Sequence, residues 1–216
     1  MSFRHYLEQE GWGGALELPE GAFPDLERLC AELLRWNRVH NLTGQREPRG
    51  VYRELFLDAL VLVPHLKGPE VLDIGSGAGF PGLVLALARP DLRVTLLEPR
   101  AKRVSFQQHA VRLLGLEGRV RPVLGRAGDG RTLTGERFAS VVLKAVGGLA
   151  ESLALARPLL APGGRVLLPR GEKDRAAALD LGLGVIPYRL PGGRKRILLV
   201  ESFDSRSGSR RAAKQT

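Results

Sequence analysis

A glycine-rich stretch at residues 73–79, Asp-Ile-Gly-Ser-Gly-Ala-Gly, has the residue types and spacing of a ligand-binding loop. It follows a short apolar run and precedes a predicted helix, the context in which glycines bring the backbone close to a ligand. The start of that helix would offer free N–H groups. A dinucleotide fingerprint would need glycine at position 80, where Phe80 stands, so a pyrophosphate ligand and a nicotinamide oxidoreductase are disfavoured. Asp73 instead suits a ligand that carries a positive charge or an amine.

A second carboxylate, Glu98, ends the next apolar run at 93–97. In that place a carboxylate can accept hydrogen bonds from both ribose hydroxyls of an adenosine, and Glu98 lies 25 residues beyond Asp73, near the usual spacing. Together with Gly75 and Gly77, the two acids predict S-adenosylmethionine as the cofactor. The alternative is an ordinary glycine-rich turn beside a surface acid. The cofactor site is favoured because the loop, the acid and the order of the predicted strands are all those expected of such a site.

The elements that would position these residues alternate between strand and helix from residue 70 onward. Alternating units predict a mostly parallel, seven-stranded sheet with helices on both faces, that is, a Rossmann-like class I S-adenosylmethionine-dependent methyltransferase fold. The last two strands read as a closing hairpin. Strands are expected at 71–74, 93–97, 120–124, 140–143, 165–168, 184–188 and 196–200, and helices at 82–88, 101–114, 147–160 and 172–181.

Residues 1–66 read as a helical subdomain, because apolar residues recur there at helical spacing. The methyltransferase domain would follow at 67–201. The polar, basic segment 202–216 is expected to be a disordered tail. Cys30 lies on an apolar helix stripe, so it is expected to be buried rather than nucleophilic.

The net charge of +10 favours a polyanionic partner, because Lys and Arg that neutralise phosphates gain affinity through counterion release. The alternative is a basic surface that reflects genome composition. No stretch approaches the roughly 18 apolar residues of a membrane helix, and the N-terminus does not read as a secretion signal. The single cysteine and the spacing of the four histidines predict no metal site. We expect a cytoplasmic monomer.

Four stretches of the chain resemble the RsmG (GidB) methyltransferases, which methylate N7 of a guanine in 16S ribosomal RNA of the small subunit. They are the Trp-Asn-x-x-x-Asn-Leu-Thr segment at 36–43, the glycine loop with its Phe-Pro-Gly extension at 72–82, the segment 96–106, and Gly-Arg-Ala at 125–127. The resemblance covers most of residues 25–200. It implies cofactor contacts by Asp73, Gly75, Gly77, Phe80, Glu98, Ala127, Gly128 and Lys144, and contacts with the RNA substrate by Asn37, Asn41, Asp58, Lys102 and Arg103.

The chain departs from the family pattern at three places. Glu54 and Leu55 replace an Arg-His pair, Lys144 replaces an arginine at the cofactor site, and Gly128 replaces an acid. Lysine keeps the positive charge at 144 but not the bidentate fork of arginine.

No catalytic residue is assigned, because guanine N7 carries a lone pair and no proton at neutral pH. Other interpretations stay open: a methyltransferase of this fold acting on a small molecule or a protein, or a non-catalytic RNA-binding relative. Lys102 and Arg103 also read as a solvated helix face, and Asn37 and Asn41 as residues that cap a loop beside the pocket.

Overall fold

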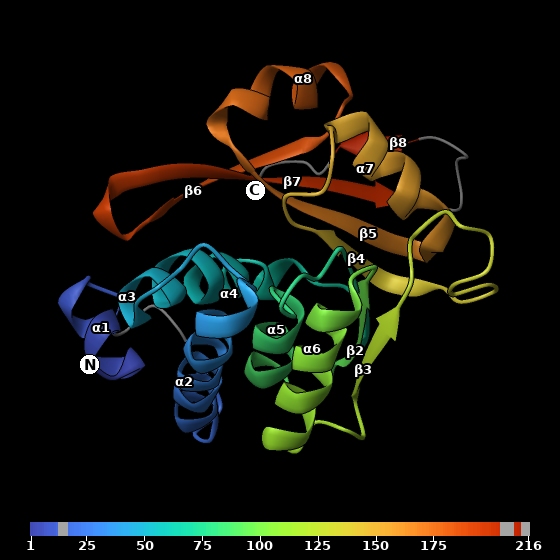
Figure 1. The fold of residues 1–216 in the computed structure, drawn as a ribbon. Coiled ribbons are helices and arrows are strands. Elements are labelled where there is room, and N and C mark those ends of the chain that lie inside the picture. The colour runs from blue at the N-terminus through green and yellow to red at the C-terminus, as the bar shows by residue number, and fades with distance from the viewer. Residues whose placement is uncertain (13–16, 204–209, 213–216) are drawn as a thin grey trace.

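One open β-sheet forms the centre of the molecule, with helices on both of its faces (Figure 1). The computed structural model describes residues 1–12, 17–203 and 210–212. The strand order is β3-β2-β1-β4-β5-β7-β6, and β8 pairs with β7. The strands are β1 (Glu70–Ile74), β2 (Arg93–Glu98), β3 (Val120–Leu124), β4 (Phe138–Leu143), β5 (Leu160–Gly171), β6 (Gly184–Leu190), β7 (Arg194–Phe203) and β8 (Arg210–Ala212).

Strands β1 to β5 run parallel, and β7 is antiparallel to both β5 and β6. This confirms the predicted Rossmann-like sheet with a closing hairpin. The central strand β1 is covered on both faces, which explains why residues 71–74 are all buried. The chain leaves β1 toward β2 on one side and enters β4 on the other, so the strand order reverses between β1 and β4. Ligands of open α/β sheets bind at such a switch point, outside the carboxyl ends of the strands.

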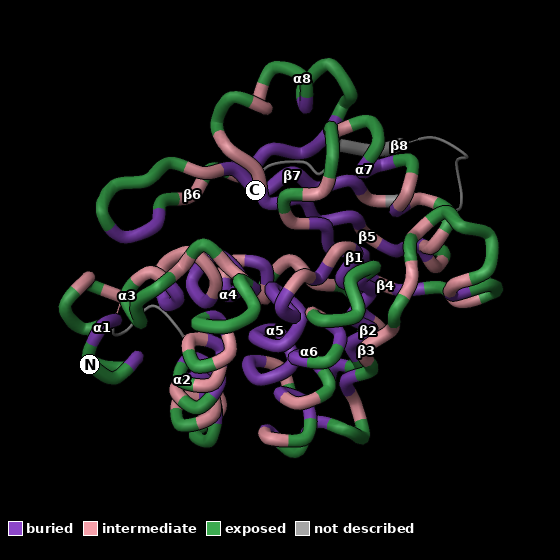
Figure 2. Tube along the Cα trace, in the orientation of Figure 1, coloured by how far each residue is buried: buried purple, intermediate pink, exposed green. Residues whose placement is uncertain are grey.

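Helices α1 to α6 lie on one side of the sheet, and α7 and α8 lie on the other (Figure 1). Every residue of α5 is buried, because this helix packs between the sheet and the N-terminal helices (Figure 2). The buried side chains of residues 1–66 form one core cluster with those of α5, α6 and the sheet. The helices are α1 (Phe3–Gln9), α2 (Ala22–His40), α3 (Pro48–Val51), α4 (Asp58–Leu60), α5 (Gly82–Ala88), α6 (Ala101–Leu113), α7 (Leu149–Ala156) and α8 (Arg175–Asp180).

Several short helical turns adjoin these helices, and two of them account for the differences from the helices predicted at 147–160 and 172–181. The turns are the π-helical turn η1 (Tyr52–Leu57) and the 3-10 turns η2 (Val63–His65), η3 (Arg157–Leu159), η4 (Glu172–Asp174) and η5 (Pro191–Gly193). The helices predicted at 147–160 and 172–181 are therefore each an α-helix joined to a 3-10 turn. The predicted strand at 165–168 is the middle of the longer β5.

The tail expected to be disordered at 202–216 is ordered in part. Strand β7 continues through residues 202 and 203, and β8 pairs with it there. The pairing of β6 with β7 ends at Val200, so the backbone of 201–203 has a free edge that β8 occupies. The expectation was wrong for 202, 203 and 210–212, and 204–209 and 213–216 lie outside the described residues.

Candidate active site

The glycine loop after β1 has the backbone conformation that its sequence predicts. Gly75 and Gly77 have φ values of 67° and 60°, which glycine adopts without steric cost. The N–H groups of Gly75 and Ser76 donate to the carbonyl of Leu97 at 2.8 and 3.1 Å, which holds the loop against β2. A Cβ at Gly75 would lie 2.6 Å from Val146, whereas a Cβ at Gly77 would have Arg103 as its nearest neighbour, at 3.8 Å. The space in front of Gly77 is therefore open to a ligand.

Glu98 lies against this loop, as its place at the end of β2 predicts. Its side chain is buried, and its Oε2 accepts the N–H of Gly77 at 2.9 Å. The N–H of Arg100 donates to Oε1 at 3.1 Å, and Arg103 Nη1 lies 3.8 Å from Oε2. Each carboxylate oxygen keeps a further lone pair. The carboxylate can therefore accept additional hydroxyl donors at the mouth of the loop.

Asp73 is fully buried beneath the loop. The N–H of Gly82, at the start of α5, donates to its Oδ2 at 2.8 Å. Oδ1 is buried and has no hydrogen-bond partner among the described residues. Burial raises the pKa of Asp73 to about 7, although the Gly82 N–H and the charge of Lys144 act in the opposite direction. A buried carboxylate with one free oxygen is suited to a cationic donor.

Gln107 of α6 fixes the loop from the other side and was not predicted. Its Nε2 donates to Ser76 Oγ at 2.8 Å and to the carbonyl of Gly77 at 2.7 Å, and its side chain is completely buried. The sequence signal was a glutamine on the buried face of an amphipathic helix. That position is unfavourable for a polar side chain unless it finds partners.

The chain after β3 runs along the same edge of the sheet. The N–H of Gly125 donates to the carbonyl of Glu98 at 3.1 Å. Ala127 is half-buried, and Gly128 is exposed with φ 82°. Asp129, one position after the family's usual acid, accepts hydrogen bonds from the hydroxyl and the N–H of Thr132 and from the N–H of Arg131, which lower its pKa to about 2. The Asp129 side chain therefore stabilises the turn at 129–132.

Lys144 and Asp58, predicted for the cofactor and the substrate respectively, form an ion pair at 2.7 Å. The Asp58 side chain is 0% exposed, and it also accepts from Tyr188 OH at 2.5 Å and from Arg196 Nη2 at 3.2 Å. Lys144 Nζ donates in addition to the carbonyl of Glu54 at 2.5 Å. This cluster joins the end of β4 to α4 and to the β6–β7 hairpin. Tyr188 and Arg196 were not predicted, although residues 188–196 contain four cations.

The departures at 54 and 55 lie beside this cluster. The Glu54 carboxylate binds Arg53 and Arg194, each at 2.8 Å, and its side chain is 11% exposed. Leu55 packs against the apolar core. Glu54 therefore connects η1 to the start of β7.

The remaining predicted residues lie in different surroundings. Asn37 is buried and holds the following loop, because its Nδ2 donates to the carbonyl of Gln45 and its Oδ1 accepts the N–H of Thr43. Asn41 ends α2 in a left-handed conformation, and its side chain accepts from Arg46 at 3.0 Å. These hydrogen bonds support the interpretation of a capped loop.

Phe80 is buried and stacks on Phe56 at 6.0 Å, so it packs the glycine loop against η1. Lys102 is exposed in the first turn of α6. Arg103 instead lies over Gly77 and Glu98, at the mouth of the loop.

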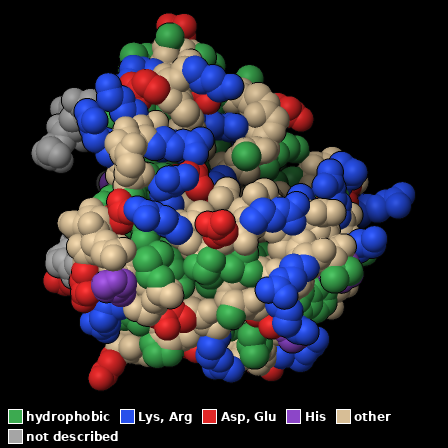
Figure 3. Space-filling model, turned by 60° about the vertical axis from the view of Figure 1, so that its left-hand side comes forward, with side chains coloured by type: hydrophobic (Ala, Val, Ile, Leu, Met, Phe, Trp, Pro, Cys, Tyr) green, Lys and Arg blue, Asp and Glu red, His purple; other side chains and the backbone are tan. Residues whose placement is uncertain are grey.

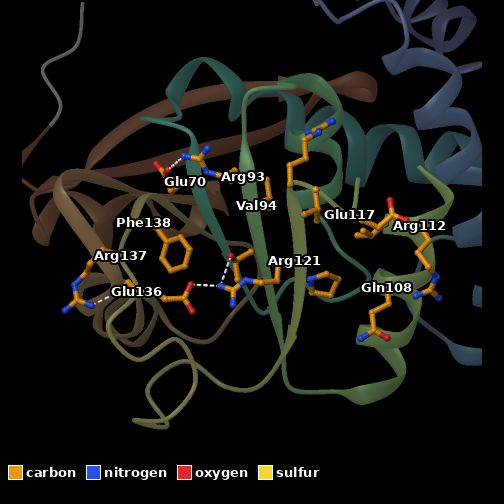
Figure 4. A pocket seen from close by; sticks show the side chains of 16 residues that line it. Glu70, Arg93, Val94, Gln108, Arg112, Glu117, Arg121, Glu136, Arg137 and Phe138 are labelled. Atoms are coloured by element: carbon orange, nitrogen blue, oxygen red, sulfur yellow. Dashed lines mark hydrogen bonds and ion pairs between the residues drawn. The ribbon is translucent and has the colours of Figure 1, made fainter. Parts of the chain in front are cut away.

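A cavity of about 760 Å³ lies at the amino ends of β1 to β4, away from the glycine loop (Figure 4). Two of its arginines, Arg93 and Arg121, pair with its own acids Glu70 and Glu136. We therefore place the candidate site at the carboxyl edge, where the switch point and the carboxylates of Asp73 and Glu98 lie. In the described part of the chain, no group of three or more His, Cys, Asp or Glu could hold a metal. No helix described there is suited by length and apolarity to cross a membrane.

Solved structures share this fold at low sequence identity. A methyltransferase from Geobacter sulfurreducens superposes with a TM-score of 0.59 at 18% identity, over 93% of this chain and 98% of the other. A predicted O-methyltransferase from Agrobacterium tumefaciens superposes with a TM-score of 0.57 at 22% identity, over 71% and 82%. The architecture is that of the class I methyltransferases.

Sequence comparison identifies the family within that class. Residues 23–181 match the GidB family, described as rRNA small subunit methyltransferase G. The ribosomal RNA small subunit methyltransferase G of Halorhodospira halophila is 39% identical over 203 residues, covering 91% of this chain and 95% of the relative. That of Chromohalobacter salexigens is 42% identical over 164 residues, covering 76% of each. The chain belongs to the GidB family, which confirms the resemblance seen in its sequence.

Proposed function

We propose that this chain transfers a methyl group from S-adenosylmethionine to N7 of one guanine in the 16S RNA of the small ribosomal subunit. The observation that carries this proposal is the contact between Gly77 and Glu98 at the switch point, in a chain of the GidB family. The enzyme would act as a monomer in the cytoplasm, where ribosomal subunits are assembled.

The residues at the edge fit the cofactor. Glu98 would accept the ribose hydroxyls, and the open space at Gly77 would admit the ligand against the loop. The unpartnered Oδ1 of Asp73 fits the amine of the methionine moiety, reached directly or through water. The backbone of Ala127 and Gly128 would approach the adenine.

The bound cofactor would supply an electrophilic methyl group on a sulfonium ion. The chain would contribute mainly proximity and alignment, since N7 has a lone pair and no proton to remove. We therefore assign no general base. The target base must be unstacked or presented in a loop, because an A-form helix hides its major-groove edge.

The substrate side would be formed by the cluster around Asp58. Asp58 binds Lys144, whose positive charge also acts on Asp73 beneath the glycine loop. Asn37 and Asn41 would act through the loop that they hold, and Lys102 and Arg103 would contact RNA phosphates at the start of α6.

The decisive experiment offers the protein two kinds of RNA with tritiated S-adenosylmethionine. One is the small subunit from cells that lack the gene for this protein, and the other is a mixture of short guanine-containing RNAs. We expect stoichiometric labelling of one guanine in the subunit, because a single target must be found among many identical N7 atoms. Equal labelling of arbitrary RNAs, or labelling of no RNA, would overturn the proposal.

A further inference from the structure

The turn between β6 and β7 concentrates positive charge. Residues 187–196, Pro-Tyr-Arg-Leu-Pro-Gly-Gly-Arg-Lys-Arg, contain four cations and no acid. Arg189 and Lys195 are exposed, and the Arg194 side chain is 55% exposed. The hairpin projects past the sheet above α3 and α4 (Figure 1), and Lys and Arg side chains form a band across the face that Figure 3 presents.

A hollow of about 370 Å³ lies against this hairpin. Its lining includes the cations Arg175, Arg189, Lys195 and Arg196 and a single acid, Glu172, which pairs with Arg175 at 2.6 Å. The amino-edge cavity differs, because three glutamates are interleaved with its arginines. Arg196 pairs with Asp58, so the excess positive charge of the hollow comes from Arg189 and Lys195, which form no salt bridge with the described side chains.

The hairpin is tied to the candidate active site close to its turn. Tyr188 on β6 and Arg196 on β7 are paired residues, and both donate to the buried carboxylate of Asp58. The same carboxylate holds Lys144 at the end of β4. Arg194 adds a second link through Glu54. An anion held by the hairpin would thus have a fixed position relative to the glycine loop.

We propose that the β6–β7 hairpin is a phosphate-binding arm that holds the RNA backbone next to the nucleotide to be methylated. This inference rests on the proposed function for the identity of the RNA. Exposed cations without interleaved acids suit backbone phosphates, which are contacted without regard to sequence. Phosphate binding by these cations would not depend on RNA sequence. Because the hairpin is attached to Asp58, however, the bound RNA backbone would lie at a defined distance from the methyl donor.

The test compares two double variants that remove the same charge. Arg189→Gln/Lys195→Gln alters the hairpin, and Arg112→Gln/Arg137→Gln alters exposed cations of the amino-edge cavity. Binding to small subunits from cells lacking the gene is measured by cosedimentation over a range of KCl concentrations, with S-adenosylhomocysteine present. Loss of two phosphate contacts should reduce the slope of log K against log salt by about 1.4 for single-stranded RNA. The amino-edge variant should keep the wild-type slope.

Equal slopes for the two variants would refute the phosphate-binding arm, because the change in RNA affinity would then depend on net charge and not on the hairpin. A hairpin variant that binds as wild type would also overturn it. Calorimetry with S-adenosylhomocysteine should give the same Kd for all three proteins, which verifies folding. Methyl transfer is measured separately: labelling that fails while the salt-dependent difference persists would refute the proposed function and leave the arm standing.

Discussion

Replacement of Asp73 by asparagine should move folding stability and cofactor binding in opposite directions. The pKa of Asp73 rises from its ordinary 3.8 to about 7 in the folded protein, mainly through burial. The folded state therefore binds this proton more tightly than the unfolded chain, and the stability it contributes is lost as pH rises through 7. The full rise in pKa means that ionised Asp73 lowers the folding stability at pH 8 by about 4 kcal/mol relative to a carboxyl that stays protonated. An asparagine carries no charge and avoids this loss, but its buried amide also needs a hydrogen-bond partner. We therefore expect Asp73→Asn to raise the free energy of unfolding at that pH by about 2 kcal/mol, less than the full amount.

Cofactor binding by the same variant should be weaker. A cationic amine binds the ionised carboxylate, so a wild-type site with a pKa of about 7 should lose about tenfold in affinity for S-adenosylhomocysteine between pH 8 and pH 6. Asp73→Asn should lower the affinity at pH 8 and flatten this pH dependence. Urea unfolding and titration calorimetry measure the two effects. Asp180→Asn, at the exposed end of α8, is the matched control and should change neither. An asparagine variant that keeps wild-type affinity and its pH dependence would refute the assignment of Asp73 to the amine.

Three further substitutions test the other parts of the site. Glu98→Ala should weaken S-adenosylhomocysteine binding by about 1.5 to 3 kcal/mol, the range for a charge-assisted hydrogen bond, as measured by calorimetry. Gly77→Ala should cost about 1 kcal/mol of folding stability, because Gly77 has a positive φ, and it should lose most of the affinity for the cofactor. Unchanged affinity in the folded variant would show that the glycine loop is not part of the cofactor site. Lys144→Ala should reduce methyl transfer far more than Lys173→Ala on the exposed turn η4, whereas Lys144→Arg should be tolerated. Equal rates for the two alanine variants would show that Lys144 is not in the site.

The sequence predicts the framework of this protein well because the framework depends on local patterns. Short apolar runs that end in glycine specify strands buried on both faces, and the alternation of strand and helix specifies a parallel sheet. The loop and Glu98 follow from the same logic, since both lie at the ends of neighbouring strands. The boundaries at η3 and η4 were less predictable, because hydrophobic spacing does not distinguish a 3-10 turn from the end of an α-helix.

The Asp58 cluster could not be predicted in the same way. Tyr188 and Arg196 are 130 and 138 residues from Asp58, and no periodic pattern connects them. Their meeting depends on how the hairpin lies over α4, which is a matter of tertiary packing. Gln107 illustrates a smaller gap: its burial was predictable from the helix stripe, but its partners Ser76 and Gly77 were not.

The departures at Glu54 and Lys144 lie next to each other, because Lys144 Nζ donates to the main-chain carbonyl of Glu54. Lys144 Nζ binds the carbonyl of Glu54 as well as the carboxylate of Asp58, a geometry that suits a compact ammonium better than a planar guanidinium. An arginine at 54 would add a cation beside Arg53 and Arg194, whereas Glu54 pairs with both. The cluster then holds four cations against the acids Glu54 and Asp58, so it stays positive after both replacements. The hairpin supplies two of those cations, Arg194 and Arg196, so the charge balance around positions 54 and 144 depends on where the hairpin lies.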